Sequence, residues 1–140
     1  MIITIPVIKD IFEVAQTLFG LGGQLVKAKK EKRDEMADYF TKVSECLNAT
    51  YDSLTANNVP HGRCAELAAY AELLPQVVKG FIADNKAQEL SLILKRSHVV
   101  EGLWEALNSD PKKGNELPKI AEASGLFMAL SNSLRAGFVP

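Results

Sequence analysis

The feature that most constrains the fold is a sustained helical period in residues 33–56. Apolar residues recur there at steps of three and four, which is the spacing of an α-helix with one buried face. They are Met36, Phe40, Val43, Leu47, Tyr51 and Leu54. The other apolar segments follow the same spacing, and strand patterns are nearly absent beyond residues 2–5. The sequence therefore predicts an all-α fold, an antiparallel bundle of four main helices plus an N-terminal amphipathic helix.

The second main helix is expected to begin near His61, after a short connection at residues 57–60 that makes it antiparallel to the first. Pro75 removes one intrahelical hydrogen bond and is expected to kink or restart the helix. The expected turn after it is residues 83–85. The inward residues are Cys64, Leu67, Ala68, Ala71, Leu74, Val78, and Phe81 or Ile82.

A third main helix is expected over residues 86–107, with a broad apolar face that Leu92 widens and with Ser91 on the polar side. Its central apolar residues are Leu90, Ile93, Leu94, Val100, Trp104 and Leu107. Residues 108–114 form the clearest loop, and Asn115 is placed to cap the last helix. Gly137 is expected to end that helix, and Phe138 to pack back on it. Its inward residues are Leu117, Ile120, Ala123 or Ser124, Phe127, Leu130 and Leu134.

The N-terminal helix is expected to start at Pro6. Its wide apolar face comprises Ile8, Ile11, Phe12, Ala15, Leu18, Phe19, Gly22, Leu25 and Val26. Three glycines weaken it by about 1 kcal/mol each relative to alanine. The helix either ends near Phe19 or continues, and the surviving period favours a continuous, softened helix docked on the bundle.

A basic collar, residues 27–33, follows this helix and carries five positive charges against one negative charge. Short charge runs are usually solvated surface. The whole chain has a net charge of −1, so nucleic acid is not an expected partner.

Length and composition predict one cytoplasmic domain over residues 1–140, divided into an N-terminal helix with its basic junction (1–30) and a four-helix body (31–140). Asp10 and Glu13 interrupt the apolar start, so no secretory signal is expected. The longest uncharged run is 13 residues, and a membrane-spanning helix needs about 20.

No metal or cofactor is expected. Zinc ligands of suitable type exist in Cys46, His61, Cys64 and His98. Helix geometry, however, separates the two cysteines by about 9 Å along the bundle and by a further 8–10 Å or so between axes. Cys46 and Cys64 are therefore expected to be small core residues.

Catalytic motifs are also missing from the sequence. Glu-x-x-His pairs of di-iron bundles do not occur, nor do a phosphate-binding loop between strand and helix, His-Glu-x-x-His or Gly-x-Ser-x-Gly. His98 is expected to be an exposed surface histidine. The aromatic residues Tyr39, Tyr51, Tyr70 and Trp104 are expected in the core or at its rim.

The function that follows is a non-enzymatic helical interaction or adaptor module that self-associates through the N-terminal helix or the helix at 86–107. The alternative is a membrane-associating bundle, whose N-terminal helix lies in the lipid interface while the collar meets anionic headgroups. A small enzyme or ligand-binding protein with an interhelical pocket comes third. The candidate interaction surface is Ile8, Phe12, Phe19, Leu25, Lys27, Lys29, Lys30, Lys32 and Arg33.

Overall fold

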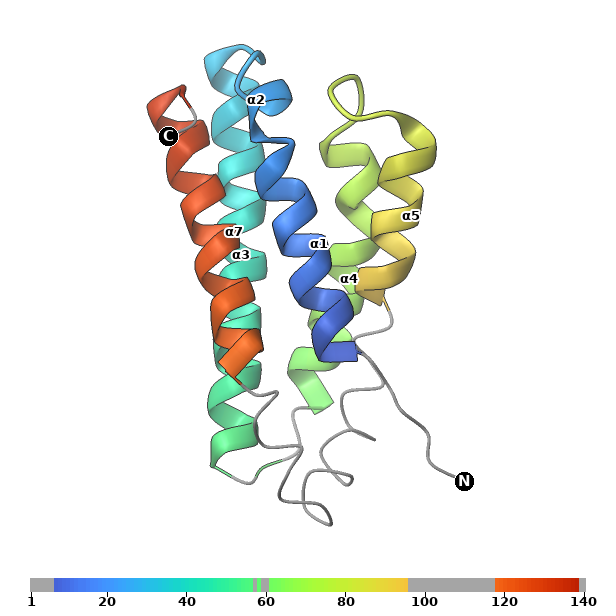
Figure 1. Cartoon of the computed structure of the whole chain (residues 1–140), viewed down its shortest axis with the longest axis vertical. Coiled ribbons are helices and arrows are strands. Elements are labelled where there is room, and N and C mark those ends of the chain that lie inside the picture. Colours follow the sequence, from blue (N-terminus) through green and yellow to red (C-terminus); the bar gives the residue numbers. More distant parts are fainter. Residues whose placement is uncertain (1–6, 57, 59–60, 96–117, 139–140) are drawn as a thin grey trace.

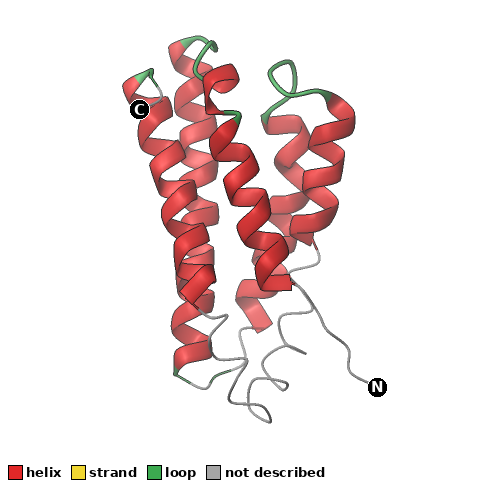
Figure 2. Ribbon diagram, in the orientation of Figure 1, coloured by secondary structure: helices red, strands yellow, loops and turns green. Residues whose placement is uncertain are grey.

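The structure, a computed structural model, describes residues 7–56, 58, 61–95 and 118–138, without the side chains of residues 7–9, 61, 63 and 64. All regular elements in these ranges are helices, so the all-α expectation is confirmed (Figure 2). They are α1 (Val7–Gly20), α2 (Gly22–Leu25), α3 (Lys30–Thr55), α4 (His61–Val77), α5 (Asp84–Lys95) and α7 (Pro118–Ala136). The arm at 2–5, the distal part of the 86–107 helix, the 108–114 loop and the Asn115 cap lie outside the described residues.

The helices form a ring in which each packs on two neighbours. α3 contacts α7, α7 contacts α1, α1 contacts α5, α5 contacts α4, and α4 contacts α3. In Figure 1, α3 and α5 run opposite to α1, α4 and α7, so α1 and α7 are a parallel pair in an otherwise antiparallel bundle. The expected docking of the N-terminal helix is confirmed, since Ile11, Val14 and Leu18 are buried. This helix closes the ring and is more than an addition to a four-helix body.

The N-terminal helix is interrupted at the glycines, so the expectation of a continuous helix was wrong. α1 ends at Gly20 and the short α2 begins at Gly22. A Cβ added at Gly20 or Gly23 would meet nothing within 4 Å, so no close neighbour requires glycine at those two positions. The weak helix propensity of consecutive glycines explains the break.

The apolar face of α3 forms the centre of the core as the period predicts. Met36, Phe40, Val43 and Leu47 are fully buried, while Tyr51 is half-buried. The ring of Phe40 stacks on Phe127 of α7, with centroids 6.0 Å apart and an interplanar angle of 20°. The expected inward residues of α7 that are described are all buried: Ile120, Ala123, Ser124, Phe127, Leu130 and Leu134.

A polar seam of hydroxyl groups joins α3 and α7 inside this core. Ser44 Oγ donates to the Ser124 carbonyl at 2.7 Å, and Ser124 Oγ donates to the Ser44 carbonyl at 2.8 Å. Further along, Ser131 Oγ donates to the Ala37 carbonyl at 2.8 Å and lies 2.7 Å from Thr41 Oγ1. Residues that come later in α3 contact residues that come earlier in α7. These hydrogen bonds fix the antiparallel register of the two helices.

A buried serine compensates for the proline inside α4. Pro75 has no N–H, so the Ala71 carbonyl lacks its usual intrahelical partner. Ser91 Oγ of α5 donates to that carbonyl at 2.6 Å. Ser91 is only 7% exposed, so its expected place on the polar side was wrong. The helix continues past Pro75 to Val77 because the neighbouring helix supplies the missing donor.

The turn between α4 and α5 comes earlier than the expected turn at residues 83–85, because α4 already ends at Val77. Ile82 is buried there, Gly80 has a positive φ of 90°, and α5 begins at Asp84, slightly before the expected start. Leu92 of α5 is 61% exposed and does not widen the buried face within the described residues, contrary to expectation.

α7 ends at Ala136, and Gly137 directly after it has a left-handed φ of 84°, as expected of the residue that stops the helix. The Phe138 N–H donates back to the Ser133 carbonyl at 3.2 Å. The guanidinium of Arg33 lies against Gly137 and occupies the space that a Cβ at this position would need. Phe138 is 63% exposed and does not pack back on the helix, which corrects the expectation for this residue.

We predict that Ser91→Ala lowers the free energy of unfolding by about 1–3 kcal/mol, because the Ala71 carbonyl then loses its donor. In a Pro75→Ala background the same change should cost less, since the alanine introduced there restores the N–H. Chemical denaturation of the wild type, both single variants and the double variant measures this coupling. Equal costs in the two backgrounds would show that Ser91 does not act through the Pro75 gap.

We also predict that Ser44→Leu lowers the free energy of unfolding by about 1–3 kcal/mol, since the seam has no room for a larger side chain. Asn48→Leu is the matched control, because Asn48 lies one turn further along α3 and is exposed. Thermal melts of the two variants should differ clearly. Similar melting temperatures would contradict a tightly packed seam.

Candidate functional site: the groove between α3 and α4

The groove between α3 and α4 is an open hollow of about 370 Å³. Its apolar floor is formed mainly by α4, where Leu73 is 51% exposed. Charged residues of both signs stand along α3. The lining residues are Lys32, Glu35, Asp38, Tyr39, Lys42, Tyr70, Leu73, Gln76 and Val77.

Two tyrosines hold the walls of this groove together. Tyr39 of α3 is buried, and its hydroxyl donates to the Tyr70 carbonyl of α4. The two rings meet edge to face, with centroids 6.2 Å apart at 87°. The Tyr70 hydroxyl donates to Glu66 Oε1 at 3.3 Å. Tyr39 and Tyr70 thus occupy the core and its rim, as expected for these aromatic residues, and Trp104 lies outside the described residues.

Both phenols are held in the neutral form. Burial raises the pKa of Tyr39, and Tyr70 raises it further. Burial also raises the pKa of Tyr70, followed by the nearby Glu66 carboxylate, which disfavours a second negative charge. At physiological pH these groups donate hydrogen bonds and do not serve as phenolate bases.

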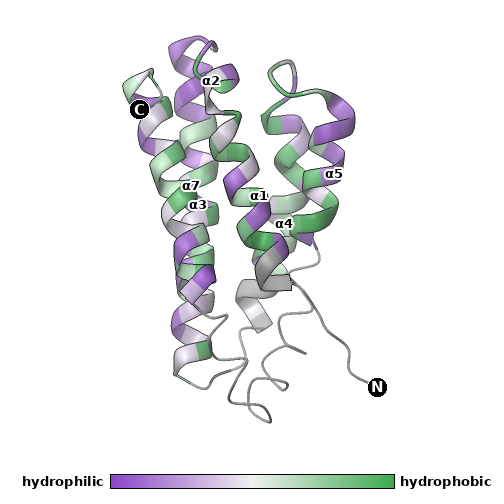
Figure 3. Cartoon of the chain, in the orientation of Figure 1, coloured by the Kyte–Doolittle hydropathy of each residue, from purple (hydrophilic) through white to green (hydrophobic). Residues whose placement is uncertain are grey.

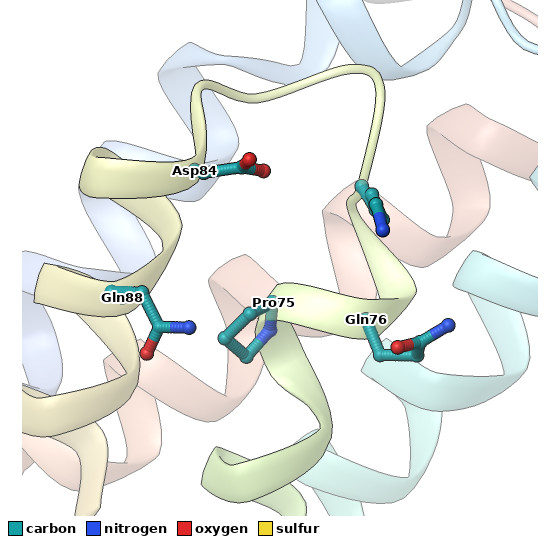
Figure 4. Close-up of a pocket in the computed structure, with 5 residues that line it drawn as sticks. Pro75, Gln76, Asp84 and Gln88 are labelled. Atoms are coloured by element: carbon teal, nitrogen blue, oxygen red, sulfur yellow. The ribbon is translucent and has the colours of Figure 1, made fainter.

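A smaller hollow of about 240 Å³ lies between the C-terminal part of α4 and the start of α5. Pro75, Gln76, Lys79, Asp84 and Gln88 line it. Figure 4 shows Gln88 of α5 pointing toward Pro75 of α4. Its walls are polar and open to solvent, and they bring one lysine and one aspartate to the same rim.

The apolar members of the expected interaction surface lie mostly inside the bundle. Leu25 is fully buried, and Phe12 and Phe19 are half-buried against the core. The side chain of Ile8 lies outside the described residues. These side chains therefore contribute to the fold of this chain, and in this conformation Leu25 is not part of an accessible surface.

The basic members divide into two groups. Lys27, Lys29 and Lys30 are exposed. Lys32 pairs with Glu35 at 3.2 Å, and Arg33 Nη1 donates to the Leu134 carbonyl at 3.4 Å. The collar is thus a solvated surface at its start and a structural contact at its end.

Of the four candidate metal ligands, only Cys46 has a described side chain. Cys46 is buried, as expected of a core cysteine, and His98 with the side chains of His61 and Cys64 lies outside the description. Among the described residues there is no group of three or more His, Cys, Asp or Glu side chains that could hold a metal ion. No helix within the described ranges has the length and apolar character needed to cross a membrane.

Comparison of the chain with protein-family models, curated proteins and solved structures finds no match. Its function is therefore inferred from its own surfaces. Sequence reasoning missed Leu73, the most exposed apolar residue of the groove. The available signal was its position beside Leu74, one step outside the buried period of α4.

We predict that the free energy of unfolding falls as the pH rises above about 10, the ordinary tyrosine pKa. Because the folded-state pKa of Tyr39 is raised, its contribution is complete below that pH and is lost above it. Tyr39→Phe should reduce this loss, at a cost of about 1 kcal/mol at neutral pH for the missing hydrogen bond. Tyr51→Phe is the matched control. Identical alkaline profiles for all three proteins would contradict the prediction.

Proposed function

We propose that this chain is a non-enzymatic helical interaction module that self-associates through the groove between α3 and α4. The observation that carries the proposal is Leu73, which is 51% exposed and lines the hollow together with Val77 and the two tyrosines. Among the described residues, only Leu73, Leu92 and Phe138 are exposed large hydrophobic residues. Leu73 alone of these three lines one of the hollows described above.

The charges of the groove favour a second copy as the occupant. Two lysines and two acidic residues line it, so two copies meet without net repulsion. An antiparallel approach of the two α3 helices sets Lys42 of each copy against Glu35 of the other, which is the reciprocal pattern of a two-fold interface. Asp38 lies nearest the axis in this arrangement, and its charge is already compensated by Arg135 at 3.0 Å.

The N-terminal helix supports self-association less well. Its apolar residues Ile11, Val14 and Leu18 are buried by α5 and α7 of the same chain. An interface through them, or their insertion into lipid, requires α1 to leave the ring. α5 has one exposed large apolar residue among the described ones, Leu92. A substitution there therefore serves as a comparison for a substitution in the groove.

We predict that Leu73→Glu weakens self-association by about a hundredfold or more, because a two-fold interface buries Leu73 twice and each buried leucine contributes roughly 1.5–3 kcal/mol. Sedimentation equilibrium over a range of concentrations measures the effect. Leu92→Glu is the matched control, with the same substitution at a similarly exposed leucine.

A strictly monomeric wild type would overturn the proposed function. A dimer that survives Leu73→Glu and is lost in Leu92→Glu would move the interface to α5 and refute the groove. Circular dichroism of both variants excludes loss of folding as the cause of either result.

A further inference from the structure

One end of the bundle combines exposed lysines with an exposed aromatic ring. Lys27, Lys29 and Lys30 are exposed at the junction of α2 and α3, and the Lys30 side chain is 77% accessible. Phe138, just after α7, is 63% exposed. We call these four residues the basic-aromatic end. None of them lines the groove between α3 and α4.

Specific contacts bring these distant parts of the sequence together. Arg33, in the first turns of α3, lies against Gly137 and donates to the Leu134 carbonyl near the end of α7. α2 also packs on α7. Figure 1 shows the α2–α3 connection and the C-terminal end of α7 at the same end of the molecule, and Figure 3 shows the hydrophilic start of α3 there. The exposed ring and the lysines therefore face solvent from one end of the bundle.

The charge of this end comes mainly from the lysines that precede the acidic turns of α3. Lys30 pairs with Asp34 at 3.1 Å, and Lys32 pairs with Glu35. Lys27 and Lys29 lie before these pairs, with Glu31 as the nearest exposed acid in the sequence. Two outward lysines beside an exposed phenylalanine match the two signals, charge and apolar insertion, that peripheral membrane contact needs.

We propose that the basic-aromatic end docks on an anionic lipid surface. Lys27 and Lys29 meet the headgroups, and Phe138 enters the interface between headgroups and acyl chains. The folded bundle binds end-on, and α1 remains packed between α5 and α7. A lipid surface fits better than nucleic acid because the chain carries a net charge of −1 and this end combines its lysines with an exposed apolar ring.

The test is co-sedimentation of the full chain with vesicles of phosphatidylcholine alone and with vesicles that also contain phosphatidylserine. We expect binding to the anionic vesicles that falls with added salt. Lys27→Ala and Lys29→Ala should each weaken it about fivefold, and Phe138→Ala about tenfold. Lys95→Ala and Leu92→Ala are the matched controls, because they remove one exposed lysine and one exposed apolar residue from α5, outside both the groove and the basic-aromatic end.

Equal binding to neutral and anionic vesicles, or equal losses in the control variants, would overturn the proposal. Binding of a DNA duplex as strong as that of anionic vesicles, lost in the same lysine variants, would overturn the lipid assignment. Leu73→Glu separates this proposal from self-association. Leu73 does not belong to the basic-aromatic end, so this variant should bind vesicles as the wild type does. Loss of vesicle binding in Leu73→Glu would also contradict end-on docking by the folded monomer.

Discussion

The close approach of α3 and α7 is the contact on which the rest of the bundle depends. It is built from hydroxyl groups that bond to the backbone of the opposite helix, with Ser44 and Ser124 exchanging hydrogen bonds across the seam. Such small side chains let the two helices pack closely, and the bonds select one register. α4 packs on α3, and α1 packs on α7. α5 then packs on both α1 and α4 and completes the ring, so the other three helices take their places from the α3–α7 pair.

The same chemistry recurs where α4 meets α5. Ser91 supplies a donor to the Ala71 carbonyl, which Pro75 has left without its helical partner. A buried hydroxyl is unfavourable without a hydrogen bond and favourable with one. Each of these serines is therefore acceptable only in the native pairing, so the polar contacts discriminate against shifted registers more sharply than an aliphatic core would.

The sequence could predict the helices and most of the core, because these depend on a period that each segment carries by itself. Phe40, Leu47, Phe127 and Leu134 are buried as that period requires. It could not predict the seam or the role of Ser91. A helical period assigns a serine to the exposed side, and its burial is understood only when its hydrogen-bond partner on another helix is known. The exposed places of Leu73 and Phe138 were missed for the same reason: burial of an apolar residue depends on a neighbour that the local pattern does not show.

The docking of α1 also bears on the form that the proposed lipid contact can take. Releasing its apolar face would expose Ile11, Val14 and Leu18, and Leu25 of α2 would follow, at roughly 1.5–3 kcal/mol for each side chain, or about 6–12 kcal/mol in all. That is comparable to the whole stability of a typical domain, about 5–15 kcal/mol. A few lysines near an anionic surface contribute only about 1 kcal/mol each. Lipid contact by the intact end of the bundle avoids this cost, so the residues available for it are Lys27, Lys29 and Phe138, and the buried face of α1 stays part of the core.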